Sequence, residues 1–373
     1  MTPAFPRKHL GRRMVLSLGI MAAGLAVGLA PLPQEQRRVV VVAGTEFQES
    51  LQALKSRFEQ AQPEITLDLY FQGSAELVRN YLDDQFRELT PTILIPANGQ
   101  ILEQLAQDWR MRENSEPYYY PPQPLAKTLM VGIAWPERGK VLFPQGRFDW
   151  ERLEQALQAG QWSAIGGPPS WGSFDLRMAD PQRSNSGQLT LALWARHVLG
   201  EELNVDNLNT ERIGALFRLI RRWVYQPPRS TDILLQEFIS QGPNQGDVAV
   251  AYESIVLHRW PQAQISQGQG YQIYYLSPTI ETVSTAVVVK RRVSPALART
   301  ARRFLDFATA PEQQQVLVQQ GFRPVIDLDL AKVPGSPWGR GIPGVALVPT
   351  GSVMPMPKPE ILEEIRKQWH RSG

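Results

Sequence analysis

The stretch Arg38-Val39-Val40-Val41-Val42-Ala43-Gly44 decides the fold class of this chain. Four consecutive valines without polar alternation are typical of a strand that is buried on both faces, and Gly44 ends the run. Apolar residues then recur at helical spacing from Phe47 to Ala61, before Pro63 stops the pattern. A buried strand that leads directly into an amphipathic helix predicts an α/β fold.

The alternation of strand and helix continues beyond this first unit. Residues 65–71 and 92–96 have the pattern of strands, and residues 75–82 and 100–109 have the pattern of helices. Strands that alternate with helices indicate a mostly parallel sheet that is flanked by helices on both faces.

Two later strands, at residues 129–135 and 282–289, are extended and apolar. If the chain crosses between two lobes at these strands, residues 38–128 and 290–345 form one lobe, and residues 136–281 form the other. We therefore predict a two-lobed α/β protein whose lobes are joined by two hinge strands.

The C-terminal extension, residues 346–373, begins in a segment with several prolines. Ile361, Leu362, Ile365 and Trp369 then recur on one face, which predicts a final helix that docks by an apolar stripe. We expect this extension to cover the back of the first lobe, and the alternative is that it docks a partner.

The N-terminal segment, residues 1–30, has the pattern of a secretory signal. Four basic residues between positions 7 and 13 precede residues 14–30, which carry no charge. The apolar run is marginal for a membrane span, which needs about 17–25 residues. Two alternatives stay open, a cleaved signal peptide of the general or twin-arginine type and a retained membrane anchor. Both locate the remaining chain in the periplasm, on the outer side of the cytoplasmic membrane.

The charge balance and the lack of cysteine exclude several classes of function. Residues 1–30 hold four of the 39 basic residues and no acidic one, which leaves 35 basic side chains against 36 acidic ones. This balance indicates no nucleic-acid-binding surface. The sequence has no cysteine, which excludes disulfides, thiolate metal sites and a cysteine nucleophile.

Motifs of common enzyme classes are missing as well. The sequence has no G-x-S-x-G, S-x-x-K or G-x-x-x-x-G-K pattern. Beyond residue 30, His197, His258 and His370 have no partner at the spacing of metal ligands. We therefore expect a protein that is not an enzyme and that uses no metal or other cofactor.

The octapeptide Asp180-Pro181-Gln182-Arg183-Ser184-Asn185-Ser186-Gly187 lies where an apolar helix begins. A helix start leaves backbone N–H groups without intrahelical partners, and Ser and Asn add hydroxyl and amide groups. Such a start can bind an anion or the oxygens of a polar solute. The alternative is an ordinary N-cap.

Four other strand or helix ends carry residues of the same kind. In an open α/β sheet, ligands bind beyond the carboxyl ends of the strands and against helix N-termini. Each end alone is an ordinary cap or turn, but their shared position predicts a binding site. The residues at these five ends are Thr45, Glu46, Ser74, Asn98, Ser184, Asn185, Ser186, Tyr252 and Glu253.

Several segments also follow one another in the order and spacing of a known family. They are Gly44-Thr45-Glu46, the segment from Trp162 through Gly166-Gly167-Pro168-Pro169 to Trp171-Gly172, the octapeptide 180–187, Asp247 to Glu253, and Gly321-Phe322-Arg323-Pro324. Together they cover most of residues 38–325. The chain resembles a bacterial extracellular solute-binding protein of the two-lobed type II class, in the branch of molybdate- and phosphate-binding-like proteins.

The resemblance implies a monomeric receptor that closes around a small polar solute and presents it to the membrane permease of an ABC importer. By position, the resemblance implies that five residues donate hydrogen bonds to the solute: Thr45, Ser74, Ser184, Asn185 and Ser186. It also implies that Trp171 and Tyr252 form walls of the cleft.

Glu46 and Glu253 depart from the pattern of an oxyanion site, because a carboxylate repels an anion. These two carboxylates favour a solute that carries hydroxyls or an amine. The alternative is that a carboxylate of the protein braces the hinge. For Glu253, a structural hydrogen bond behind the site is the alternative. The identity of the solute and of the transporter stays open.

The alternative function is a membrane-anchored envelope sensor or interaction protein with the same fold and no transport role. An anchor retained at residues 14–30 would favour it, as would a peptide-like ligand or none.

Overall fold

The valine run forms a strand inside the sheet. In the computed structural model, which describes residues 37–86, 89–224, 226–349 and 351–373, β1 (Arg37–Gly44) lies between β2 (Ile65–Gln72) and β3 (Ile93–Ile95). Val39, Val41, Val42 and Ala43 are fully buried, as a strand covered on both faces requires. The segment interpreted as a signal or anchor, residues 1–30, lies outside the described residues.

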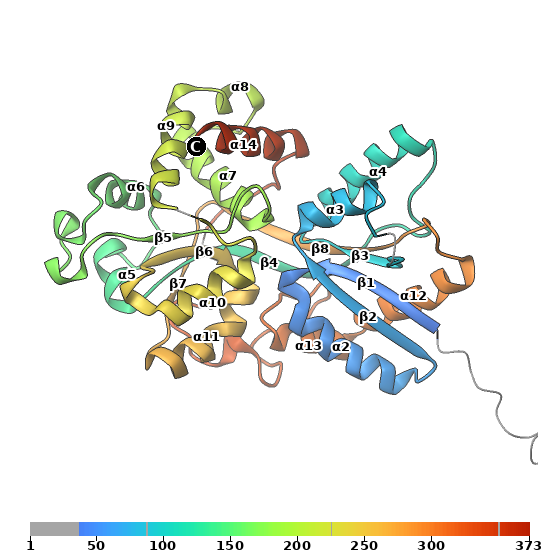
Figure 1. Ribbon diagram of the computed structural model, residues 1–373. Coiled ribbons are helices and arrows are strands. Elements are labelled where there is room, and N and C mark those ends of the chain that lie inside the picture. Colours follow the sequence, from blue (N-terminus) through green and yellow to red (C-terminus); the bar gives the residue numbers. More distant parts are fainter. Residues whose placement is uncertain (1–36, 87–88, 225, 350) are drawn as a thin grey trace, which may run out of the picture. The chain divides into compact units, whose positions relative to one another are not determined.

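Within the described residues, the sheet has nine strands. Its main path runs β2-β1-β3-β8-β4-β6-β5, with β7 beside β4 and β9 beside β8. The bounds of the other strands are β4 (Gln123–Ala134), β5 (Leu176–Arg177), β6 (Val248–Tyr252), β7 (Gln272–Tyr275), β8 (Thr279–Val288) and β9 (Val353–Met354). Figure 1 shows that β4 and β8 run between two groups of helices.

The pairing of the strands is mixed, and this differs from the mostly parallel sheets that we expected. The pairs β1–β3 and β5–β6 are parallel, whereas β8 pairs antiparallel with β3, and β4 pairs antiparallel with β8, β6 and β7. The β4–β8 pair is antiparallel because the chain leaves the first group of elements, which is built around β1, β2 and β3, along β4 and returns to it along β8. The elements between β4 and β8 form the second group. The α/β class is confirmed. Hydrophobic periodicity reports burial, not strand direction.

One hydrophobic core surrounds β1, β2 and β3. Its buried members come from residues 39–126 and 286–322, so two distant parts of the chain share it. Phe58 packs edge-on against Phe304 and Phe307, for example. The helices of this core are α2 (Gln48–Ala61), α3 (Ser74–Leu82), α4 (Gly99–Glu113), α12 (Pro295–Ala308) and α13 (Pro311–Gln319).

Two further cores lie on opposite faces of β4 and β6. Met130 and Ala134 belong to one core, and Val131 and Ile133 belong to the other, because successive side chains of a strand point to opposite faces. The helices around these cores are α5 (Pro136–Leu142), α6 (Trp150–Ala159), α7 (Asn185–Leu199), α8 (Val205–Leu208), α9 (Glu211–Trp223), α10 (Thr231–Gln241) and α11 (Glu253–Gln267).

The division of the chain into lobes stays a prediction, but the packing of residues 333–342 differs from it. The expected first lobe includes residues 290–345, yet Val333, Trp338 and Ile342 pack in the core beneath α10 and α11. The end of this segment therefore lies with the second group of elements.

The C-terminal helix α14 (Pro359–Arg371) docks by the expected apolar stripe. Ile361, Leu362, Ile365 and Trp369 are buried, and Trp369 packs edge-on against Phe217 of α9. The main neighbours of α14 are α7, α8 and α9 (Figure 1), and it also contacts α4. The helix therefore docks mainly on the second group of elements and not on the first, where we expected it. The amphipathic helix α9 offers the complementary apolar face.

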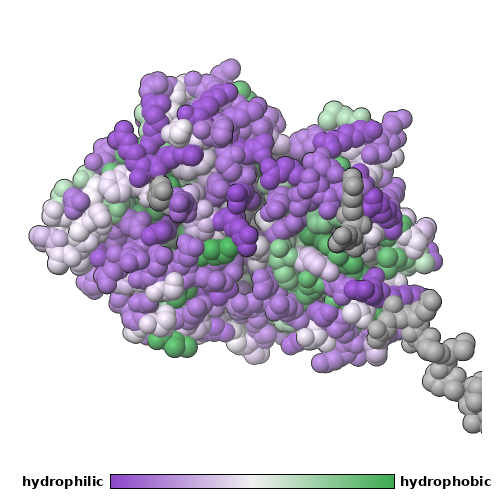
Figure 2. Space-filling view, in the orientation of Figure 1, coloured by the Kyte–Doolittle hydropathy of each residue, from purple (hydrophilic) through white to green (hydrophobic). Residues whose placement is uncertain are grey.

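The surface of residues 38–373 is largely hydrophilic on the face shown in Figure 2. Large exposed hydrophobic side chains are scattered among separate elements, such as Met111 on α4 and Ile265 on α11. No helix in the described part of the chain is long and apolar enough to cross a membrane.

Candidate functional site

Three of the expected site residues form a chain of hydrogen bonds that links the two groups of elements. Asn98 donates from Nδ2 to Oδ1 of Asn185 at 3.1 Å, and Asn185 donates from Nδ2 to the Tyr252 hydroxyl at 2.7 Å. Asn98 precedes α4, Asn185 begins α7 and Tyr252 ends β6. The structure therefore brings together strand and helix ends that lie up to 154 positions apart.

Local capping explains why Asn98 can serve this link. Its Oδ1 accepts a hydrogen bond from the backbone N–H of Ile101 at 3.2 Å, as an N-cap residue does. The amide nitrogen is then free to reach Asn185 across the junction. Asn98 is only 2% exposed, and both of its polar side-chain atoms have hydrogen-bond partners within the protein.

The serines of the site are buried and hydrogen-bonded as well. Ser184 Oγ lies 3.0 Å from Ser186 Oγ, which lies 2.6 Å from Thr231 Oγ1 at the start of α10. Ser74 Oγ accepts a hydrogen bond from the Ala97 backbone N–H at 2.9 Å. The sequence analysis missed Thr231, although Ser230-Thr231-Asp232 is a helix-start pattern that could have revealed it.

The starts of α3 and α7 approach each other at backbone distance. A Cβ atom built on Gly73, directly before α3, would lie 2.8 Å from the carbonyl oxygen of Arg183. A real Cβ does not come this close to a backbone atom, so the approach requires glycine here. Hydrophilic residues gather in this region, where the two groups of elements meet (Figure 2).

Glu46 lies near Tyr252 of the Asn98–Asn185–Tyr252 chain, and its carboxyl group has an unsatisfied oxygen. Its Oε1 is buried and has no hydrogen-bond partner in the protein. Burial raises the pKa of Glu46 to about 7, opposed by a hydrogen bond from its own backbone N–H and reinforced by the negative charge of Asp232. The charge of Glu46 in turn helps burial to raise the pKa of Tyr252, so Glu46 and Tyr252 are electrostatic neighbours.

A small cavity of about 20 Å³ adjoins Glu46. It lies between the 3-10 turn Thr45–Phe47 with the start of α2 on one side, and the starts of α10 and α11 on the other. Its volume is enough for one water-sized group. Its lining residues are Thr45, Glu46, Gln48, Glu49, Ser50, Asp232, Ser254, Ile255, His258, Arg259 and Gln320.

The cations at this cavity already have acidic partners. His258 pairs with Glu49, and Arg259 contacts Glu49 at 3.4 Å and Asp232 at 2.6 Å. Because none of the ion pairs among the described residues includes Glu46, its carboxyl group lacks a compensating charge. Within the same residues, no group of three His, Cys, Asp or Glu side chains is arranged to hold a metal ion.

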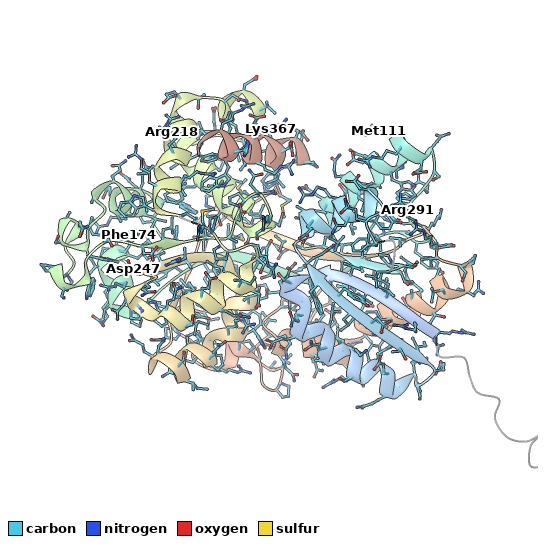
Figure 3. The ribbon with its side chains drawn as sticks, in the orientation of Figure 1. Met111, Phe174, Arg218, Asp247, Arg291 and Lys367 are labelled. Atoms are coloured by element: carbon cyan, nitrogen blue, oxygen red, sulfur yellow. The ribbon has the colours of Figure 1, made fainter. Side chains whose placement is uncertain are left out.

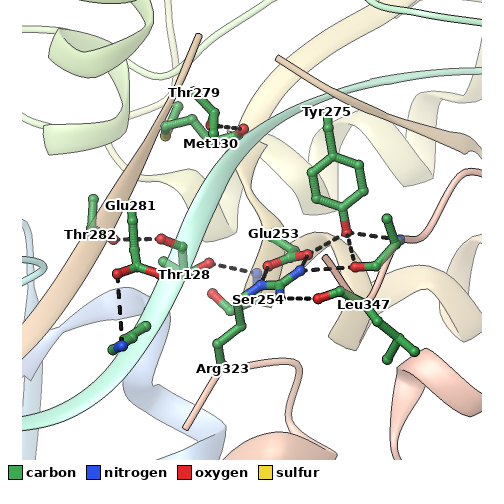
Figure 4. A network of polar contacts seen from close by, with 12 residues as sticks. Thr128, Met130, Glu253, Ser254, Tyr275, Thr279, Glu281, Thr282, Arg323 and Leu347 are labelled. Carbon is green, nitrogen blue, oxygen red and sulfur yellow. Dashed lines mark hydrogen bonds and ion pairs between the residues drawn. The ribbon is translucent and has the colours of Figure 1, made fainter. Parts of the chain in front are cut away.

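Glu253 belongs to a separate buried network, shown in Figure 4. Its Oε2 accepts from Nε of Arg323 at 2.7 Å, and its Oε1 accepts from Nη2 of Arg323 at 2.8 Å and from the Tyr275 hydroxyl. Both oxygens are therefore occupied by partners within the protein, and its assignment as a solute ligand stays a prediction. The alternative of a structural hydrogen bond behind the site fits the geometry.

Trp171 lies away from the Asn98–Asn185–Tyr252 chain, and its assignment as a wall of the cleft stays a prediction. The Arg138 guanidinium stacks 3.8 Å above its ring, and Arg138 Nε pairs with Oδ1 of Asp247 at 2.8 Å. Asp247 directly precedes β6, whereas Tyr252 ends it, and a strand of this length separates them by roughly 16 Å. Figure 3 shows Asp247 near Phe174, away from β4 and β8 where they run between the two groups of helices.

The family of this chain follows from its match to a family model. Residues 39–323 match the model of the bacterial extracellular solute-binding proteins. The chain belongs to this family. A search of curated proteins found no match.

Solved structures of solute-binding proteins share the fold of the family member described here. A periplasmic thiamin-binding protein is similar with a TM-score of 0.62 and 14% identity, over 90% of this chain and 96% of its own. The sulfate-binding protein SubI from Mycobacterium tuberculosis has a TM-score of 0.58 and 16% identity, over 89% and 98%. Iron-bound HitA from Pseudomonas aeruginosa has a TM-score of 0.58 and 14% identity, over 90% and 99%. At these identities the likeness concerns the fold, which is the two-lobed α/β fold of periplasmic binding proteins.

Proposed function

We propose that this protein is a solute receptor of the periplasm that binds a small polar molecule at the junction of its lobes and delivers it to the permease of an ABC importer. The observation that carries the proposal is the buried chain Asn98–Asn185–Tyr252, which joins helix and strand ends from both groups of elements. Membership of the solute-binding family supports the same function.

The proposed site consists of the polar residues at the junction, without Trp171 and Glu253. Hydroxyl and amide groups at helix starts can donate to or accept from a solute, while the free backbone N–H groups add further donors. The site residues are Thr45, Glu46, Ser74, Asn98, Ser184, Asn185, Ser186, Thr231 and Tyr252.

The proposal requires the junction to open. The cavity of about 20 Å³ holds no more than a water-sized group, so a larger solute must separate contacts such as Asn98–Asn185. We infer that β4 and β8 act as the hinge strands, since they pair with each other between the two groups of elements.

The test is a thermal-unfolding screen of the full chain against oxyanions, amines, amino acids, sugars and short peptides. A solute present at about 100 times its dissociation constant should stabilise the protein by about 2.7 kcal/mol and raise Tm by a few degrees. We expect Asn185→Ala to lose this shift and Ser266→Ala, a change on the exposed surface of α11, to keep it. If no solute class raises Tm, the receptor function is wrong and an envelope sensor or interaction protein becomes the better hypothesis.

A further inference from the structure

Two residues that line the cavity beside Glu46 carry buried polar atoms without partners. One is Oε1 of Glu46, and the other is Oγ of Ser254, a residue with no exposed surface. They reach the cavity from different groups of elements, because Glu46 follows β1 and Ser254 lies in the first turn of α11. Buried polar atoms normally have partners, so two unpaired ones on residues that line one cavity favour a polar ligand there.

To pair with an ionised Glu46, a bound group must be a donor. A carboxylate accepts hydrogen bonds only, and a serine hydroxyl can accept as well as donate. A positive charge is also missing, since His258 and Arg259 already pair with Glu49 and Asp232. An anion at this place would face Glu46 and Asp232 together, which is electrostatically unfavourable.

We propose that the cavity binds the ammonium head group of a cationic amine, with Glu46 Oε1 and Ser254 Oγ as its hydrogen-bond acceptors. This inference rests on the proposed function, because it assigns the chemical class of the solute at that site. An ammonium group matches the volume of about 20 Å³, and the rest of the molecule extends toward Asn185 and Tyr252. The Glu46 side chain folds back over Gly44, since a Cβ atom built on Gly44 would lie 2.3 and 2.6 Å from its two carboxyl oxygens.

The pH dependence of binding distinguishes a cation from an anion. Without solute, the pKa of Glu46 is raised to about 7 by burial, so the group is mostly protonated at pH 6 and mostly ionised at pH 8. A cation pairs with the ionised form, and its affinity should therefore rise about tenfold from pH 6 to pH 8. An oxyanion held by the protonated carboxyl would show the opposite trend.

Other titratable groups around Glu46 call for a control. Asp232, Tyr252 and the Glu49–His258 pair surround the same cavity or its edge. The variant His258→Gln removes the imidazole from this set. If the pH dependence comes from Glu46, it persists in His258→Gln.

The experiment is calorimetric titration of the full chain at pH 6 and pH 8. The cationic probes are putrescine, lysine and arginine, and the comparison probes are sulfate, molybdate and glucose. We expect one of the cations to bind, with about tenfold higher affinity at pH 8. Glu46→Gln should lower its affinity at pH 8 at least tenfold and remove the pH dependence, whereas Glu76→Gln, an exposed change of the same kind on α3, should do neither.

The outcomes separate this inference from the proposed function. If sulfate, molybdate or glucose binds and no cation does, the solute class is wrong while the receptor function stands. The same conclusion follows if a cation binds with equal affinity to Glu46→Gln and to the unchanged protein. If no probe of any class binds, the inference fails together with the receptor function. Circular dichroism of each variant establishes that it is folded.

Discussion

Arg323 and Glu253 form a buried ion pair through two hydrogen bonds, and this pair fixes the start of α11 to a distant part of the chain. Arg323 also donates to the carbonyl oxygens of Leu347 and Ala346. One guanidinium therefore connects three segments behind the proposed site (Figure 4). Because Glu253 has no exposed surface, its charge depends entirely on this partner and on Tyr275.

We expect Arg323→Met to destabilise the protein by about 3–5 kcal/mol, because it leaves the Glu253 carboxylate buried without its counter-charge. Urea unfolding followed by tryptophan fluorescence measures the change. The control is Arg303→Met, which breaks an exposed pair with Glu64 and should cost at most about 1 kcal/mol. Equal losses in the two variants would contradict a special role for the buried pair.

Gly73→Ala should destabilise the protein by about 1–3 kcal/mol, because the new methyl group overlaps the Arg183 carbonyl oxygen across the junction. Gly214→Ala is the matched control inside α9, where the methyl group meets the ends of the flexible Arg218 and Glu211 side chains. That change should stabilise the helix by about 0.5–1 kcal/mol. Opposite signs in urea unfolding are the expected result, and a neutral Gly73→Ala would argue against the close approach.

The raised pKa of Glu46 predicts a loss of stability as the pH increases. The folded protein binds the proton more tightly than the unfolded chain does, so the free energy of unfolding should fall from about pH 4.5 to pH 7 and level off above it. Glu46→Gln stays neutral and removes this contribution. Relative to the unchanged protein, we expect the variant to be more stable by ~3 kcal/mol at pH 8 and nearly equal at pH 4. Urea unfolding at several pH values measures this difference, and a constant difference across them would refute the burial of the group.

Short-range patterns predicted the elements and the helix starts of the site. The valine run at 39–42 and the Ser and Asn residues at 184–186 are local signals, because burial periodicity and capping act within a few residues. These signals located the strand β1 and the start of α7. Their mutual contacts, such as Asn98–Asn185, follow from the rule that strand ends meet at one edge of a sheet.

The surroundings of Glu253 and Trp171 could not be predicted, because both side chains contact residues that are distant in the sequence. Glu253 is paired by Arg323, which is 70 positions away, and Trp171 is covered by Arg138. Both arginines belong to segments whose neighbours are set by the tertiary fold. The direction of the hinge strands was hidden for the same reason, since an apolar strand has the same pattern in parallel and antiparallel pairs.

The packing of α14 gives a last prediction, which concerns the C-terminal extension. Trp369 is 2% exposed, packs against Phe217, and lies beneath the Arg221 guanidinium, which is 5.0 Å from its ring centre. Trp369→Ala should therefore cost about 3–5 kcal/mol in urea unfolding, since it removes a large buried side chain. Met111→Ala, at a side chain that is 78% exposed, should change the stability by at most about 0.5 kcal/mol. If both changes are equally small, α14 is not held against α9 in solution, and its stripe is free to bind another surface.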